Sequence, residues 1–340
     1  QSNQKREDKL MRKSDWKRAG ALALATAMLA TALALPASAT ADAAYTERLT
    51  ELCEQEWSAP VAFRQGMQQL MQEHPDSPEP YYLYASNLWN SKLNWGEAVS
   101  EAEKEEALSY LNTAIGLALR ADHPYQSRWS YGQDDTPWEL GDEPDYATLA
   151  SKVRVEILSS MPGRQAELNE AMQQYLDCGD RGARIGLKDI EQEEALYLQR
   201  ELAYGESEEQ ARQYAADRME NDREYYTTRL NREIPQDRAE LARIRTWTGT
   251  GATSFEVHVG DDVEQITIAE DRESIREEND WHTYVWVTSK PIQSIQRTLD
   301  GIVAFVPAGT EVKLQGDSLG GYIVKKDASL SCRNVTFVGV

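Results

Sequence analysis

Cysteine and histidine are both scarce: the 340 residues include only three cysteines and four histidines. The cysteines form no C-x-x-C pair and have no histidine at zinc-ligand spacing, and the histidines form no H-E-x-x-H motif. A Cys–His catalytic signature and a phosphate-binding glycine loop are absent as well. We therefore expect no metal and no cofactor, we assign no catalytic residue, and we favour a binding function over an enzymatic one.

Basic residues are in deficit, since 36 lysines and arginines stand against 57 aspartates and glutamates, a net charge of −21. Removing residues 1–39 takes away seven basic and three acidic side chains and leaves a net charge of −25. Such a surface repels phosphate backbones and anionic lipid headgroups, so we expect no nucleic-acid partner and no peripheral membrane binding. We interpret the acidity as a means of solubility rather than as a dedicated site for a cation or a basic partner.

A long apolar run occurs near the N-terminus, in residues Ala21 to Leu35. Four basic residues lie between Met11 and this run: Arg12, Lys13, Lys17 and Arg18. Pro36 and the small residues 37–39 end the run, which completes the three-part pattern of a secretory signal peptide. The run holds 15 residues, whereas a spanning helix needs roughly 20. We therefore interpret residues 1–39 as upstream residues plus a cleavable signal rather than an anchor.

This signal predicts a periplasmic or secreted protein, cleaved after Ala39 and without stable membrane insertion afterwards. No cysteine follows the apolar run closely, which argues against a lipid anchor, and the composition of the signal is typical of bacteria. An oxidising compartment permits one disulfide among Cys53, Cys178 and Cys332. The sequence leaves all three pairings open.

Composition divides the remaining chain near Trp247 and predicts an α+β fold. Residues 40–246 are rich in Ala, Leu, Glu, Gln and Arg with few β-branched residues, which predicts a helical domain, either repeat-like or a bundle. Ser207 with Gln210 predicts a capped helix start, and Tyr214 belongs to the apolar face that follows. Residues 247–340 change to short alternating segments, which predict a smaller all-β domain.

Glycine, proline and aspartate separate most of the expected strands. Residues 255–259 and 263–268 flank Gly260-Asp261-Asp262, which is a hairpin signal. Further strands are expected at 283–288, 302–306, 311–314, 321–325 and 334–338. This spacing is typical of a small sandwich, a barrel or a short β-solenoid.

A group of residues in the helical half has repeat-like spacing. Four of them follow the i, i+3, i+4, i+7 pattern: Tyr81, Tyr84, Ala85 and Leu88. Three more fit a second helix, Ala107, Leu111 and Ala114, and three before Pro75 fit a preceding one, Phe63, Met67 and Leu70. Over residues 46–125 this pattern resembles a tetratricopeptide-type repeat, although Ala85 to Ala107 exceeds the family spacing by about ten residues. The resemblance implies stacked helix pairs with a concave surface that binds protein segments. A non-repeating bundle is the alternative.

Residues 123–146 are unusual because aromatic and acidic side chains alternate with Gly and Pro in one loop. The aromatic residues are candidates for ligand binding: Tyr125, Trp129, Tyr131, Trp138 and Tyr146. We favour the interpretation that these rings pin a long loop to its domain, with ligand contact as the alternative. The acids between them could act in pairs on a glycan: Asp134, Asp135, Glu139, Asp142, Glu143 and Asp145.

Three functions remain open at this point. We favour an exported, soluble module that binds a protein or peptide. The first alternative is a cell-envelope glycan or cell-wall hydrolase that uses the acids of residues 134–145. The second is an assembly element in which the β domain pairs its edge strands.

Overall fold

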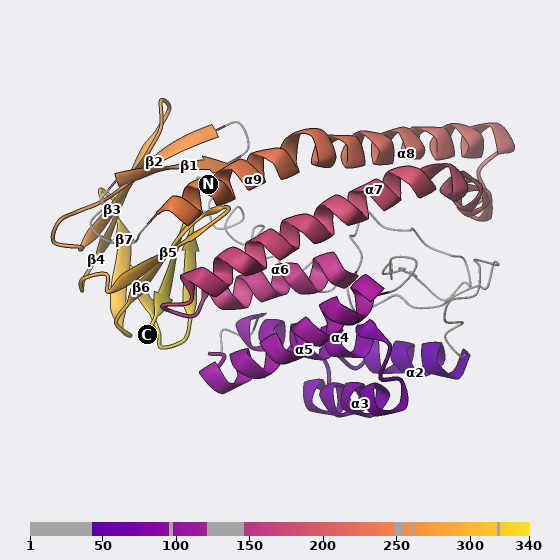
Figure 1. Ribbon diagram of the computed structural model, residues 1–340, viewed down its shortest axis with the longest axis horizontal. Coiled ribbons are helices and arrows are strands. Elements are labelled where there is room, and N and C mark those ends of the chain that lie inside the picture. Colours follow the sequence, from indigo (N-terminus) through magenta and orange to yellow (C-terminus); the bar gives the residue numbers. More distant parts are fainter. Residues whose placement is uncertain (1–42, 95–97, 121–145, 248–253, 260–261, 318–319) are drawn as a thin grey trace.

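The computed structural model describes residues 43–94, 98–120, 146–247, 254–259, 262–317 and 320–340 (Figure 1). A helical part comes first and an all-β part of two sheets follows, which confirms the expected α+β fold. Figure 1 shows the β part at one end of an elongated molecule and the helices extending away from it. Among the described helices, none has both the length and the apolar character needed to cross a bilayer.

The helical part runs from Ala43 to Thr246. Its elements are α2 (Ala43–Cys53), α3 (Pro60–Glu73), α4 (Pro78–Asn94), α5 (Glu101–Arg120), α6 (Tyr146–Ser159), α7 (Gln165–Ala203), α8 (Glu208–Thr228), the π-helical turn η1 (Arg229–Glu233) and α9 (Ile234–Thr246). Two helices, α3 and α4, begin with proline, which suits a first turn because the missing N–H has no partner there. The expected cap of α8 is confirmed, since the Ser207 side chain accepts a hydrogen bond from Gln210 N.

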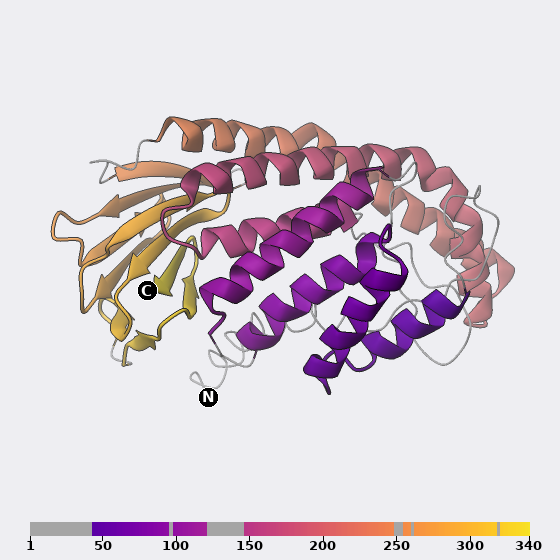
Figure 2. The same cartoon turned by 60° about the horizontal axis from the view of Figure 1, so that its bottom comes forward.

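Helices α2 to α8 pack on one another in chain order, so that sequence neighbours are also spatial neighbours. Figure 2 brings the N-terminal helices forward and shows them lying side by side. The residues with repeat-like spacing are core residues here: Ala85, Leu88, Ala107, Leu111 and Ala114 are buried, as are Phe63, Met67 and Leu70. Helix α4 also contacts α6, as alternate helices do in a repeat array. A bundle would bury the same residues, so this packing is compatible with both interpretations.

Helices α7 and α8 form a long antiparallel hairpin whose contact depends on small and polar residues. A Cβ added to Gly186 would lie 2.3 Å from the Tyr226 ring, so the two helices approach closely at this glycine. Farther along, Tyr197 donates a hydrogen bond of 2.7 Å to buried Asp222. Tyr214, which we expected on the apolar face of α8, is 46% exposed, because the buried contact is made by Ala211 and Ala215. That assignment was wrong.

The β part is a sandwich. Its strands are β1 (Ser254–Val259), β2 (Asp262–Ile268), β3 (Ser274–Glu278), β4 (Thr283–Thr288), β5 (Ser294–Thr298), β6 (Gly301–Val306), β7 (Thr310–Leu314), β8 (Tyr322–Val324), β9 (Ser329–Cys332) and β10 (Val335–Gly339). One sheet has the order β1-β2-β3-β4-β7-β8 and the other β5-β6-β10-β9. Strands β6 and β10 run parallel, and the named pairs around them are antiparallel. Apolar residues of both sheets share one core, which includes Ile266 and Ile275 from the first and Ala304 and Phe337 from the second.

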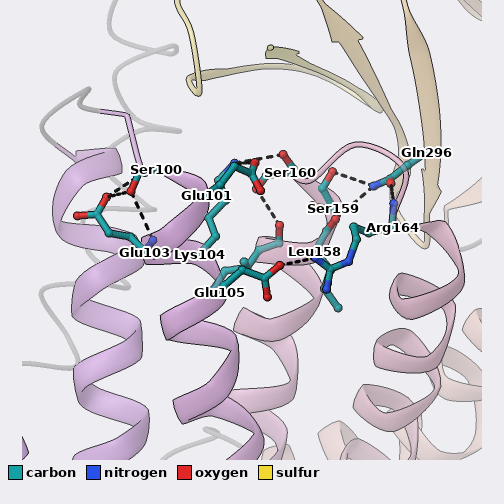
Figure 3. Close-up of polar contacts among 11 residues, drawn as sticks. Ser100, Glu101, Glu103, Lys104, Glu105, Leu158, Ser159, Ser160, Arg164 and Gln296 are labelled. Carbon is teal, nitrogen blue, oxygen red and sulfur yellow. Dashed lines mark hydrogen bonds and ion pairs between the residues drawn. The ribbon is translucent and has the colours of Figure 1, made fainter.

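The two parts meet in a polar joint around β5 (Figure 3). Gln296 donates to the carbonyl oxygens of Leu158 (3.2 Å) and Ser159 (3.3 Å) at the end of α6, and its Oε1 accepts from Arg164 N at 2.7 Å. Gln165 then binds both backbone groups of Arg297, at 2.7 and 3.0 Å. Edge strand β5 is therefore bonded to the helical part through side chains at the α6–α7 connection.

An ion pair lies at the centre of this joint. Arg297 Nη2 donates to Glu240 Oε1 of α9 at 2.6 Å, and the two side chains are 3% and 1% exposed. The same nitrogen donates to Glu256 O of β1 at 2.9 Å, and the guanidinium lies 4.6 Å from the Phe255 ring centroid. One arginine thus connects α9, β1 and β5.

A second buried cation extends the joint toward α5. The Lys104 ammonium, on a side chain 2% exposed, donates to Ser160 O at 3.3 Å and lies 3.6 Å from Glu101 (Figure 3). Arg164 forms ion pairs with Glu105 at 2.5 Å and with Glu167. The start of α7 is consequently held by charged contacts on both sides.

The three cysteines are thiols rather than disulfides in the structure. Cys53 and Cys178 are buried in the helical core, whereas Cys332 is half-buried in the β sandwich. None of the three possible disulfides is formed. Burial raises the pKa of both Cys53 and Cys332 to about 12, so these thiols stay protonated at neutral pH.

Candidate interaction site at the end of the β sandwich

The structure describes only one of the five aromatic residues that the sequence suggested for ligand binding. Tyr125, Trp129, Tyr131 and Trp138 lie outside the described residues, and so do the acids of residues 134–145. Tyr146 is described: it is buried at the start of α6, with its ring 5.4 Å from that of Tyr82 in an edge contact. It belongs to the helical core.

Two buried glutamates stand out in the β sandwich. Glu264 of β2 and Glu277 of β3 are each less than 5% exposed and point to the inner face of the six-stranded sheet. The strand register explains this orientation, because residues that pair across strands lie on the same face of the sheet. Glu264 pairs with Val257 and Glu277 pairs with Ile266, and both apolar partners are core residues. Two carboxylates therefore take positions that alternation would give to apolar residues.

Glu264 is held by donors from two turns. Its Oε1 accepts from Asn279 Nδ2 at 3.0 Å in the β3–β4 turn and from Arg333 Nη2 at 3.4 Å in the β9–β10 turn. His282 Nε2 lies 3.1 Å from the same oxygen, close enough for an ion pair when the imidazole is protonated. The other oxygen, Oε2, is buried without a hydrogen-bond partner among the described residues.

Glu277 has a partner at each oxygen. Oε1 accepts from Asn334 Nδ2 at 2.8 Å and lies 3.5 Å from Arg333 Nε, while Oε2 accepts from Trp286 Nε1 at 3.2 Å. Both glutamates therefore share one guanidinium, and the β9–β10 turn is bonded to the opposite sheet through them.

Arg333 occupies a costly backbone position. Its φ is +46°, in the left-handed region that a residue with a side chain enters at a cost of roughly 1–2 kcal/mol. The two-residue turn is fixed by its neighbour, because Asn334 O accepts from Ile302 N at 2.8 Å and a Cβ on Gly301 would lie only 1.9 Å from that oxygen. The side chain lies 4.7 Å over the Tyr284 ring and is 38% exposed. Its bonds to both glutamates offset the backbone strain.

The adjacent β3–β4 turn presents a tryptophan to solvent. Asn279 Oδ1 accepts from the backbone N–H groups of Trp281 (2.9 Å) and His282 (3.1 Å), while its Nδ2 donates to buried Glu264. This one amide fixes the turn to the core and leaves the Trp281 side chain 89% exposed. The exposed indole is thus carried on a backbone that is already ordered.

Aromatic rings continue from this turn along β4. The rings of His282 and Tyr284 are 4.9 Å apart, and those of Tyr284 and Trp286 are 6.2 Å apart and nearly parallel. We use the name Trp281 surface for Asp280, Trp281, His282, Tyr284 and Arg333. It is a partly exposed aromatic and charged surface above two buried carboxylates.

This chemistry suits recognition better than catalysis. In the described part of the chain, no group of three or more His, Cys, Asp or Glu residues is placed to hold a metal ion. The nearest thiol, Cys332, has its pKa raised by burial and by Glu277, so it is no nucleophile at neutral pH. The two carboxylates bind the same arginine and so share one environment, whereas an acid–base pair requires two different environments that separate the two pKa values.

Sequence reasoning did not find this site, although a signal was present. In Val263–Ile268, Glu264 has the same alternation phase as Ile266 and Ile268. Glu277 has the phase of Ile275. An acid in phase with an apolar face predicts a buried charge that needs partners.

Comparison of the chain with known proteins finds no matching family model, no matching curated protein and no matching solved structure.

Proposed function

We propose that this chain is an exported binding protein that recognises a protein partner through the Trp281 surface. The observation that carries the proposal is the 89% exposed Trp281 on a turn fixed by Asn279 and Glu264. Tryptophan, tyrosine and arginine dominate binding energy at protein interfaces, and this surface combines all three. Since the turn is ordered already, a partner meets an anchor whose backbone entropy is lost before binding.

The helical part fits the same function in a supporting role. Its neighbour-to-neighbour packing and the contact of α4 with α6 are compatible with the tetratricopeptide-type interpretation, in which stacked helices bind protein segments. The joint through Arg297 fixes the orientation of this array relative to the β sandwich. A partner could therefore contact both parts at a constant spacing.

A second candidate is assembly through strand β8, at the edge of the six-stranded sheet. Tyr322 and Ile323 on this strand are 61% and 68% exposed, which is unusual because edge strands commonly carry charge instead. Pairing of β8 with a strand of another chain would cover them.

A comparison of two variants separates these functions. We expect Trp281→Ala to lower the affinity for the natural partner by about 30-fold, as loss of a hot spot of about 2 kcal/mol would. Tyr322→Ala serves as the matched control, since it also removes an exposed ring from the β domain and should leave binding unchanged. The measurement is quantitative affinity capture from an extract of the source cell by equal amounts of folded wild type and variant. Loss with Tyr322→Ala alone would favour assembly through β8 and contradict the first proposal.

Export has its own test. The chain recovered from outside the cytoplasm should begin at Thr40, because cleavage is expected after Ala39. N-terminal sequencing or intact mass gives the answer. Recovery only from the cytoplasm, with residues 11–39 still attached, would refute this part of the proposal.

A further inference from the structure

We infer that the Trp281 surface takes a lysine- or arginine-bearing segment of the partner; this inference rests on the proposed function. Three properties of the molecule support it: the local charge, the aromatic geometry and the charge of the whole chain.

Acidic groups outnumber basic ones around Trp281. Among the described side chains, four carboxylates belong to β2, β3 and the β3–β4 turn: Glu264, Glu277, Glu278 and Asp280. Two arginines face them, Arg276 on Glu278 and Arg333 on the two buried glutamates, which leaves a local charge of −2 with histidine neutral. Glu264 and Glu277 are both buried and share the single guanidinium of Arg333, so one negative charge of the pair is buried without a cation of its own; Glu264 Oε2 also lacks a hydrogen-bond partner among the described residues. A buried charge exerts a stronger field than an exposed one, because water screens it less.

The site already binds one guanidinium. Arg333 lies 4.7 Å over the Tyr284 ring while its nitrogens contact both glutamates, so an aromatic face next to carboxylates holds a cation here. Trp281 offers a second aromatic face beside Asp280, and at 89% exposure this face is open to solvent. Tryptophan is the best aromatic partner for a cation, and the contact strengthens when a partner excludes water.

The charge of the whole chain acts in the same direction. With a net charge of −21, the molecule attracts basic partners over distance and repels acidic ones. Acidity that favours solubility thus has a second use at the Trp281 surface, where it attracts a basic partner. The partner segment that fits this surface is basic and extended, so that a Lys or Arg side chain can contact the face of the Trp281 indole.

Peptide display on the full chain tests the inference without knowledge of the partner. A random peptide library is selected on immobilised wild type after counter-selection on Trp281→Ala. The supporting result is enrichment of peptides with two or more Lys or Arg residues that bind the wild type at least tenfold more tightly than the variant. Enrichment of Trp281-dependent peptides that are neutral or acidic would overturn the inference and leave the proposed function standing. Absence of any Trp281-dependent peptide would count against both.

Charge variants then test the electrostatic part with the selected peptide. Asp280→Asn should weaken binding two- to fivefold, the range expected for one exposed charge. The control is Glu209→Gln, an equally exposed acid at the start of α8, at the end of the molecule away from the β part (Figure 1). Equal affinities for Asp280→Asn and wild type, or equal losses in both variants, would show that local charge does not select the peptide.

Discussion

Replacing Arg297 with Met is expected to lower the free energy of unfolding by about 3–5 kcal/mol. The substitution leaves Glu240, 1% exposed, without the guanidinium that lies 2.6 Å from it in the wild type. It also frees Glu256 O, which accepts from the same nitrogen. A buried carboxylate without its cation costs far more than the ion pair contributes, because the charge cannot regain its water. Denaturant unfolding of the full chain at neutral pH gives the value.

Two further variants make this result specific. Arg243 binds the same glutamate at 3.0 Å but is 46% exposed, so Arg243→Met should cost less than about 1 kcal/mol. The double variant Arg297→Met/Glu240→Leu should recover most of the loss, since it removes both charges from the joint. A loss below 1 kcal/mol for Arg297→Met, or no recovery in the double variant, would show that the joint tolerates an unpaired charge.

The second large effect is a loss of stability as pH rises from 5 to 8. Burial raises the pKa of Glu56 and of Glu79 from 4.5 to about 7. Tyr45 donates a hydrogen bond to Glu79 at 3.3 Å, which lowers the pKa of Glu79 by less than burial raises it. In the unfolded chain these groups ionise near 4.5, whereas in the folded chain they stay protonated to about 7. The contribution of these two groups to the free energy of unfolding is therefore largest below pH 4.5, and it falls as the pH rises to about 7. Each contributes a loss of roughly 3 kcal/mol at most.

Glu79→Gln provides the decisive comparison, because glutamine resembles the protonated acid and does not titrate. The variant should lose roughly a third of the pH dependence between pH 5 and 8 in denaturant unfolding, because burial also raises the pKa of Glu56 to about 7, that of Asp237 to about 6 and that of Asp300. Arginine lowers the pKa of other acids, such as Glu167 and Asp180. The contribution of these acids to the free energy of unfolding changes only below their ordinary pKa values, so they do not offset the loss between pH 5 and 8. Glu209→Gln is the control with an unchanged slope. Equal slopes for Glu79→Gln and wild type would contradict the assignment.

The sequence predicted the architecture well where residues serve only packing. Strands β4 and β6 were expected because their residues alternate or are continuously apolar, and β6 is buried along its length. Strands β3, β5 and β9 were not expected. Strand β5 reads Ser-Ile-Gln-Arg-Thr, and its Gln296 and Arg297 are polar because they bond to the helical part. A strand selected for a polar contact loses the pattern that identifies it.

The candidate site escaped prediction for a related reason. Glu277 lies in β3, whose polar sequence Ser-Ile-Arg-Glu-Glu hides one buried acid among exposed charges. Two of its partners, Arg333 and Asn334, come from the β9–β10 turn, and Asn334 is 57 residues away in sequence. Local pattern can indicate a buried charge, but the partner that satisfies it is set by how the two sheets stack.

The joint also determines how the chain is completed during synthesis. Glu240 leaves the ribosome 57 residues before Arg297, and the backbone N–H of Arg164 precedes its acceptor Gln296 by 132 residues. Until β5 emerges, the Arg164 N–H lacks its acceptor, and Glu240 has Arg243 of its own helix but not Arg297 as a cationic partner. The helical array is therefore finished from its C-terminal side by a strand of the other domain, and a cut within residues 248–253 would divide a single bonded unit rather than release two independent ones.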